Sequence, residues 1–164
     1  MNVAKRTAAY ASTILTFLLV AAPVCAETNP ADDFMALADF SRRYAAAWSS
    51  QDPDQLASMY SADGALVVNE GEPAVGRKAI AAKAAGFMEA FPDMKVEMIA
   101  VQKDGDGARF DWRWTGTNSG PGGTGRHVNI RGFELWTFGE DGLIQQSLGN
   151  YDKTDFDRQV NPEQ

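Results

Sequence analysis

The spacing of apolar residues divides the chain into a helical first part and a stranded second part. Between residues 29 and 90, apolar side chains recur every three to four positions, which is typical of amphipathic helices. From residue 94 onward the period changes to two, as in half-buried strands. Helices followed by a run of long strands predict an α+β domain in which a curved antiparallel sheet wraps the helices.

Capping and turn residues set the expected boundaries. Asn29-Pro30 and Asp52-Pro53 are helix start signals, and the first helix has an inward face of Phe34, Leu37, Phe40, Tyr44 and Trp48. The expected elements are a helix from Pro30, a short helix from Pro53 to a stop at Ala62-Asp63-Gly64, a strand at 65–69, a helix at 77–90, and strands at 94–101, 108–117, 126–138 and 143–151. Residues 118–125 are expected to form a glycine-rich loop.

One strand carries a carboxylate on its apolar face. Glu134 falls in the same phase as Ile130 and Trp136. A buried carboxylate is costly unless it is hydrogen bonded, so Glu134 is either a structural partner of another buried group, the working group of a site, or a solvated residue on a bulged strand. In an apolar pocket its pKa would rise, and it would act as a neutral donor or as a base near neutral pH.

Other inward-facing side chains are candidates for the wall of a pocket. Tryptophans in such positions are commonly plain core, but four in a small domain favour a pocket for a flat, apolar compound. Gln146 and Asn150 share a phase with Ile144 and Leu148 on the last strand. The expected pocket-lining residues are Trp48, Asn69, Trp112, Trp114, Asn118, Trp136, Gln146 and Asn150.

The N-terminal segment is expected to be removed. Lys5 and Arg6 precede an apolar run too short to span a bilayer, and Val24-Cys25-Ala26 has the small-residue pattern of a cleavage site. Residues 1–26 are therefore interpreted as a secretory signal peptide and residues 27–164 as one domain, which predicts a periplasmic or secreted protein.

Charge and composition narrow the partners. Cleavage leaves 13 basic residues against 22 acidic residues, a net charge of −9. Such a surface repels nucleic acid and anionic membranes, so a small molecule is the expected partner. The one histidine, His127, lies in the phase opposite Glu134, and the only cysteine leaves with the signal peptide. We therefore expect no metal site and no cofactor.

Several short motifs are similar to a known family. Residues from Arg43-Tyr44 to Ala62-Asp63 align without a gap to the first two helices of ketosteroid isomerases. GRKAI at 76–80, FPDMKVEM at 91–98, TGTNSG at 115–120, TGRHV at 124–128 and DGLI at 141–144 are similar to the SnoaL-like pattern. The chain thus resembles the nuclear transport factor 2 superfamily, within it the SnoaL-like polyketide cyclases and ketosteroid isomerases. The resemblance implies a cone-shaped fold, with three N-terminal helices packed on a strongly curved antiparallel sheet enclosing an apolar pocket, and homodimers through the sheet.

The resemblance also suggests roles for individual residues. Glu134 occupies the position of the isomerase acid that donates to an oxyanion, and of the cyclase acid/base; Tyr44 occupies the position of the tyrosine that assists it. The isomerase base would lie at Val68 and the cyclase histidine at Asn118, so neither mechanism carries over whole. The leading hypothesis is proton transfer of the cyclisation or isomerisation type on an apolar carbonyl compound, with Glu134 and Tyr44 as catalytic residues. The alternative is a non-catalytic domain that binds or scavenges a small ligand, and the sequence leaves open whether the chain is an enzyme.

Overall fold

The structure, a computed structural model, describes residues 30–161, so the expected signal peptide lies outside the described residues. In chain order the elements are α1 (Pro30–Ser49), α2 (Pro53–Ala57), β1 (Tyr60–Val68), β2 (Ala74–Val75), α3 (Arg77–Ala90), β3 (Lys95–Asp104), β4 (Gly107–Thr117), β5 (His127–Phe138), β6 (Ile144–Tyr151) and α4 (Lys153–Val160). The predicted α+β class is confirmed. None of these helices is long and apolar enough to cross a membrane.

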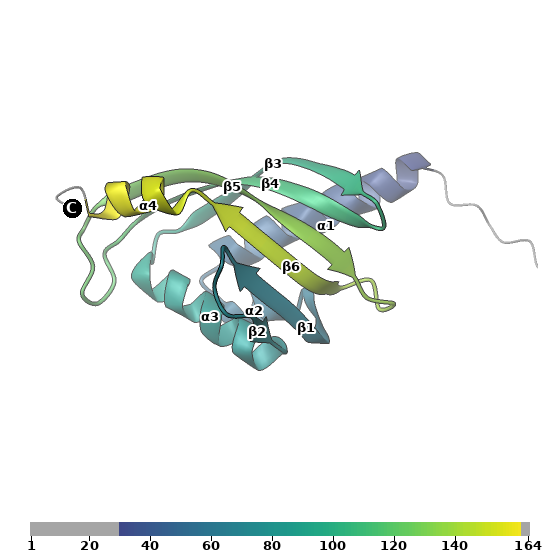
Figure 1. The fold of residues 1–164 in the computed structure, drawn as a ribbon, viewed down its shortest axis with the longest axis horizontal. Helices are drawn as coiled ribbons and strands as arrows, with labels where there is room; N and C mark the ends of the chain where they lie inside the picture. The colour runs from purple at the N-terminus through teal and green to yellow at the C-terminus, as the bar shows by residue number, and fades with distance from the viewer. Residues whose placement is uncertain (1–29, 162–164) are drawn as a thin grey trace, which may run out of the picture.

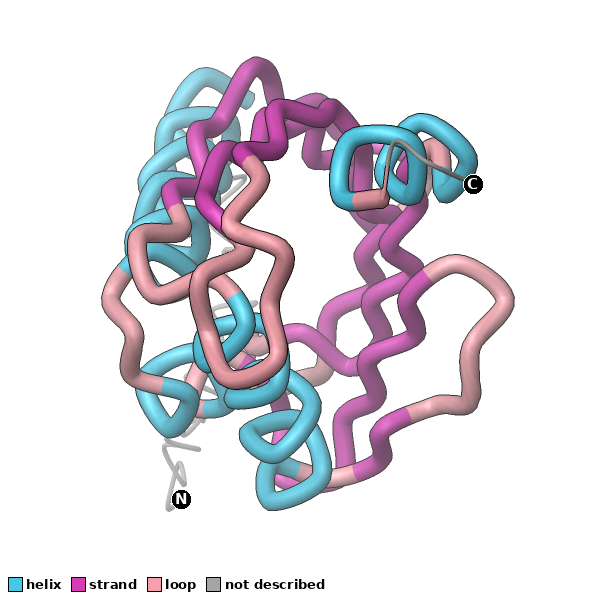
Figure 2. The backbone as a smooth tube through the Cα atoms, turned by 90° about the vertical axis from the view of Figure 1, so that its left-hand side faces the viewer, coloured by secondary structure: helices cyan, strands magenta, loops and turns pink. Residues whose placement is uncertain are grey.

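The strands form one curved sheet in the order β2-β1-β6-β5-β4-β3. Neighbouring strands run antiparallel except for β1 and β6, which are parallel. Figure 1 shows the long helix α1 running behind β3 and β4, with α3 below the sheet. In the view of Figure 2 the sheet bends around the side on which these helices lie. This is the cone-shaped arrangement that the family resemblance implied.

Helix α1 buries most of its expected face. Phe40, Tyr44 and Trp48 are buried in the core between α1 and the sheet. Phe34, which was expected on the same face, is 49% exposed. Its part of the helix extends toward the tip of the β3–β4 hairpin, where Asp33 pairs with Lys103. The apolar spacing alone does not show where the sheet beneath the helix ends.

The second helix ends earlier than predicted. Asp52 caps α2 by accepting hydrogen bonds from the backbone N–H groups of Asp54 and Gln55. The helix stops at Ala57, and β1 begins at Tyr60 instead of Ala65. The reason is pairing with a distant strand, because the backbone N–H of Ile144 donates to the Met59 carbonyl and Tyr60 pairs with Ile144. Long-range pairing overrides the local helix pattern here.

Two elements were not predicted. Strand β2 is only Ala74–Val75 and pairs with β1. Helix α4 is capped by Asp152 and covers the part of β5 that extends beyond β6, where Gln159 exchanges hydrogen bonds with the backbone of Asn129. Its Phe156 packs against Trp114 at 5.6 Å between ring centroids. Helix α4 therefore replaces a missing strand partner and closes one end of the core.

Candidate functional site

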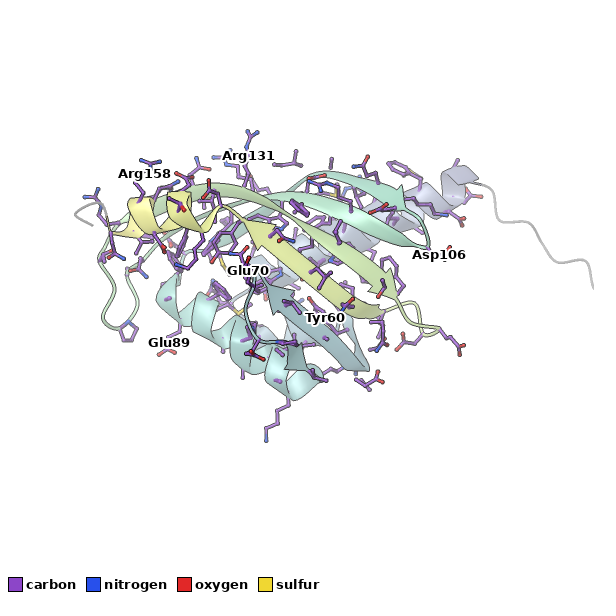
Figure 3. The ribbon with its side chains drawn as sticks, in the orientation of Figure 1. Tyr60, Glu70, Glu89, Asp106, Arg131 and Arg158 are labelled. Carbon is purple, nitrogen blue, oxygen red and sulfur yellow. The ribbon has the colours of Figure 1, made fainter. Side chains whose placement is uncertain are left out.

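Glu134 lies near the middle of β5, and its carboxyl points into the cone. It pairs with Phe110 of β4 and Gly149 of β6, and only 6% of the residue is exposed. Val128, Ile130 and Trp136 are buried in the same phase, while His127 and Arg131 of the opposite phase are exposed. Figure 3 shows Arg131 projecting outward from the sheet. The predicted alternation of this strand is confirmed.

Three side chains from three elements donate to one oxygen of Glu134. The Tyr44 hydroxyl of α1 lies 2.8 Å from Oε2, and the indole nitrogen of Trp136 lies 3.0 Å from it. The Ser147 hydroxyl of β6 also donates to Oε2. Among the described residues nothing donates to Oε1. The carboxyl is therefore asymmetric, with one saturated oxygen and one that is free.

A second tyrosine extends this set of hydrogen bonds. The Tyr60 hydroxyl, at the start of β1 (Figure 3), lies 2.7 Å from that of Tyr44. Because Tyr44 uses its proton on Glu134, Tyr60 is the donor in this second bond. Both tyrosines are completely buried. We call Tyr44, Tyr60, Glu134, Trp136 and Ser147 the carboxylate network.

Burial and hydrogen bonding act on Glu134 in opposite directions. Burial raises the pKa of the carboxyl above its usual range, and the hydrogen bonds from Ser147, Trp136 and Tyr44 partly offset the rise. Burial and the nearby Glu134 charge also raise the pKa of Tyr44 and Tyr60 well above their usual value, so both stay neutral. Since three donors occupy Oε2, the proton of the neutral acid lies on Oε1.

A cavity lies beside Glu134. The cavity and the open space at its mouth together measure about 510 Å³. Its wall consists of Trp48, Leu66, Val68, Phe87, Met94, Val96, Trp112, Trp114, Glu134, Gly149 and Tyr151. Glu134 is the only carboxyl in this wall and Tyr151 its only other titratable group. We call Trp48, Phe87, Trp112, Trp114 and Tyr151 the aromatic wall.

The aromatic wall is held by packing. Trp114 meets Phe87 and Phe91 edge to face and stacks on Phe156. Trp112 lies against Gly132 so closely that a Cβ there would come within 2.4 Å of its ring. The indole nitrogens of Trp112 and Trp114 are buried and have no hydrogen-bond partner among residues 30–161. Since these nitrogens are covered, the rings present carbon to the cavity.

The structure divides the predicted site residues into three groups. Trp48, Trp112, Trp114 and Glu134 line the cavity. Tyr44 and Trp136 are outside the wall and reach the site only through Glu134. The four predicted amides are also outside the wall: Asn69, Asn118, Gln146 and Asn150.

The placement of Gln146 and Asn150 in the pocket is wrong because of a bulge in β6. Phe138 pairs with Ile144 whereas Thr137 pairs with Gln146, which leaves Gln145 as an extra residue. The alternation therefore reverses after Ile144, and Ser147 and Gly149 turn inward instead. Gln146 is exposed, and the Asn150 amide donates to the Leu148 carbonyl.

Asn69 and Asn118 hold backbone instead of lining the mouth. The Asn69 side chain accepts from the backbone N–H of Tyr151 and ties the end of β1 to that of β6. Asn118 donates to the Ala90 carbonyl at the end of α3 and accepts from the backbone N–H of Thr124. Both amides are bonded within the fold.

Sequence reasoning missed three residues of the site. Ser147, Tyr60 and Tyr151 were assigned no role, although each is in the carboxylate network or the aromatic wall. Ser147 has no local signal, since its phase depends on the bulge. Only one sequence feature could have pointed to Tyr60, namely that it is an aromatic residue close to a predicted helix end. Val68, at the position of the isomerase base, lines the cavity as an apolar residue.

Among residues 30–161, no three His, Cys, Asp or Glu side chains come together as metal ligands. His127 is exposed at the start of β5, facing Thr117 across the sheet. The wall likewise offers no group of ligands.

Comparison with solved structures shows the fold in proteins of low sequence identity. A protein from Jannaschia sp. CCS1, assigned as a SnoaL-like polyketide cyclase, has a TM-score of 0.71 at 19% identity, covering 84% of this chain and 99% of the other. A protein with a ketosteroid isomerase-like fold from Catenulispora acidiphila, in complex with trimethylamine, has a TM-score of 0.67 at 20% identity, covering 74% and 92%. A phenazine biosynthesis-related protein from Pseudomonas aeruginosa has a TM-score of 0.61 at 17% identity, covering 79% and 90%.

Family membership rests on the sequence match. No curated protein sequence is significantly similar to this chain. The family model of the SnoaL-like domain, however, matches residues 41–147, from α1 through the first half of β6. This range contains the whole carboxylate network. The chain therefore belongs to the SnoaL-like domain family of the nuclear transport factor 2-like superfamily.

Proposed function

We propose that this protein binds a small, largely apolar organic molecule in the cavity, with Glu134 as its polar anchor. The observation that carries this proposal is the asymmetry of Glu134. Its Oε2 is saturated by three donors, while the residue forms the only carboxyl in an otherwise apolar wall. A few placed polar groups in an apolar pocket are the usual composition of small-molecule sites.

A second candidate function is proton transfer on a carbonyl compound. The raised pKa of Glu134 and its free Oε1 favour this function, because such a carboxyl can donate a proton to an oxyanion or remove one from carbon. Tyr44 would then be a positioning residue, since its hydroxyl is bonded to Glu134 behind the wall. Val68 supplies no second base. Glu134 would have to act alone, and binding without chemistry therefore ranks first.

Proton exchange on a ketone distinguishes the two functions. In this experiment, the wild type, Glu134→Gln and the exposed control Glu140→Gln are each incubated with cyclohexanone in D₂O. NMR then measures the uptake of deuterium at the α-carbons of the ketone. Binding alone predicts fluorescence changes from the wall tryptophans and uptake no faster than in buffer. Uptake that is orders of magnitude faster, and is lost in Glu134→Gln but kept in Glu140→Gln, would make catalysis the function.

A substitution that narrows the cavity tests whether the ligand occupies it. A Cβ at Gly149 would lie 3.4 Å from the Val67 carbonyl oxygen and 3.6 Å from Glu134 Cγ, both ordinary contacts, so Gly149→Ala should fold normally. Its methyl group fills part of the space beside the carboxyl. Binding of a native ligand, detected by native mass spectrometry of the purified protein, should weaken in Gly149→Ala. Unchanged binding would place the ligand elsewhere.

Export and dimer formation are part of the proposal. The charged N-terminus, short apolar run and small-residue pattern before residue 27 support export to the periplasm or medium. The outer face of the sheet, where Arg109 pairs with Asp111 and stacks on Phe133, is a polar surface for a homodimer. N-terminal sequencing of the exported protein and sedimentation of the purified protein test these points.

A further inference from the structure

The ligand class follows from the charge and chemistry of the wall. We propose that the cavity binds a small organic cation, a tertiary or quaternary ammonium group, held between the aromatic wall and the Glu134 carboxylate. This inference rests on the proposed binding function and adds the class of ligand to it.

The wall is rich in aromatic side chains. Five of its eleven residues are aromatic, and three of these are tryptophans. The indole nitrogens of Trp112 and Trp114 are covered, so ring carbon faces the space. Aromatic faces attract cations through the ring quadrupole, tryptophan most strongly, and rings around a cavity are the usual site for quaternary ammonium groups.

The charge of the Glu134 carboxylate is not compensated within the described residues. The ionised Glu134 has hydrogen-bond donors but no ion pair with any described residue. No Lys, Arg or His lies in the wall. A cation next to Oε1 would supply the missing counter-charge, whereas a neutral acceptor such as a ketone could use only the protonated form of the acid.

Glu134 is the group whose titration should make cation binding depend on pH. Tyr44 of α1, Tyr60 of β1 and Tyr151 of β6 are the titratable side chains that face it or share its wall. Their pKa values are raised by burial, so all three remain neutral across the working range. Cation affinity should therefore increase as pH rises through the pKa of Glu134, and then level off.

An isosteric pair of probes tests the charge directly. Tetramethylammonium and tert-butanol have similar size and shape, and only the first is charged. Tryptophan fluorescence and NMR titration of the wild type at pH 8 should show the cation binding at least about tenfold more tightly. At pH 4 this preference should shrink. This comparison needs no variant.

Variants then locate the effect. Glu134→Gln keeps the size of the side chain. It should weaken the binding of tetramethylammonium by about tenfold or more and change the binding of tert-butanol by less than about twofold. Glu140→Gln removes a charge from an exposed position and should change neither probe. Trp48→Leu removes one ring and should weaken the binding of tetramethylammonium roughly threefold to thirtyfold.

The outcomes separate this inference from the function on which it rests. If tert-butanol or cyclohexanone binds in the cavity as tightly as tetramethylammonium, the cation class is wrong while the binding function stands. If a cation binds equally well to Glu134→Gln, the carboxylate is not its anchor and the inference also fails. If no probe, charged or neutral, perturbs the wall tryptophans at millimolar concentration, the binding function itself is wrong.

Discussion

The carboxylate network, which reaches the cavity through Glu134, and the aromatic wall are held in different ways. In the network, hydroxyl, indole and carboxyl groups satisfy one another, from Tyr60 through Tyr44 to Glu134. In the wall, the indole nitrogens of Trp112 and Trp114 are buried without a hydrogen-bond partner in the part of the chain that the structure describes. Directional bonds thus fix the carboxyl, whereas shape alone fixes the rings. Substitutions in the network should disturb charge and stability together, and substitutions in the wall should act mainly through packing.

The largest effect is expected where the wall rests on backbone. In Gly132→Ala the new Cβ would come within 2.4 Å of both the Asn150 carbonyl and the Trp112 ring, so the strand or the ring must move. We expect a loss of about 3–5 kcal/mol in the free energy of unfolding, measured by urea denaturation.

Gly86→Ala is the matched control for this substitution. Gly86 lies on α3, and apart from the backbone of its own helix no described residue has an atom within 4 Å of the position of a Cβ. Alanine there should stabilise the protein by roughly 0.5–1 kcal/mol, because glycine is a poor helix former. Similar losses in both variants would show that the close contact at Gly132 is unimportant.

The same substitution in the two regions tests the comparison most directly. Trp136→Phe removes both ring volume and a donor to the buried carboxyl, and should cost about 3 kcal/mol. Trp112→Phe removes ring volume and an unpartnered N–H, and should cost about 1 kcal/mol. Equal losses of unfolding free energy would mean that hydrogen bonding to Glu134 contributes little.

A tyrosine pair extends this test with a smaller change in volume. Tyr44→Phe deletes a donor to Glu134 and leaves the Tyr60 hydroxyl without its acceptor, at a cost of about 2 kcal/mol. Tyr151→Phe, in the half-buried part of the wall, should change stability by less than about 0.5 kcal/mol. Urea denaturation of both variants measures the two losses of unfolding free energy. Equal losses would contradict the expected difference between the network and the wall.

The smallest effect is a pH dependence. Burial raises the pKa of Glu134 in the folded state, so the folded protein holds this proton more readily than the unfolded chain. The resulting stabilisation is complete below the unfolded carboxyl pKa of about 4.3 and is lost as pH rises through the higher folded pKa. Glu134→Gln stays neutral throughout.

The stability of Glu134→Gln relative to the wild type should therefore increase over that interval and then level off. Unfolding free energies between pH 4 and pH 9 measure the change. Asp93 and Asp141, whose pKa values are lowered by hydrogen bonds, occur in both proteins and cancel. A constant difference at every pH would contradict the assignment of a raised pKa to Glu134.

Local pattern predicted much of the fold and part of the site. The capping signals and apolar spacing identified α1 and α3, and strict alternation in β4 and β5 placed Trp112, Trp114 and Glu134 on the inner face. These elements were predictable because each has a single period over ten or more residues. Helix α4, by contrast, has a local cap but is held by an edge of β5 that only the assembled sheet leaves open.

The amino-acid sequence by itself thus determined that an acidic residue would face an apolar interior lined with tryptophans. Only the tertiary structure decided what surrounds that acid. An extra residue at Gln145 turned Ser147 inward in place of Gln146, and parallel pairing with β6 converted the stretch from Tyr60 into a strand. Tyr44 and Glu134 are 90 positions apart in the chain, so their hydrogen bond has no local signature. Periodicity reports which face a side chain occupies, but the partners on that face come from packing.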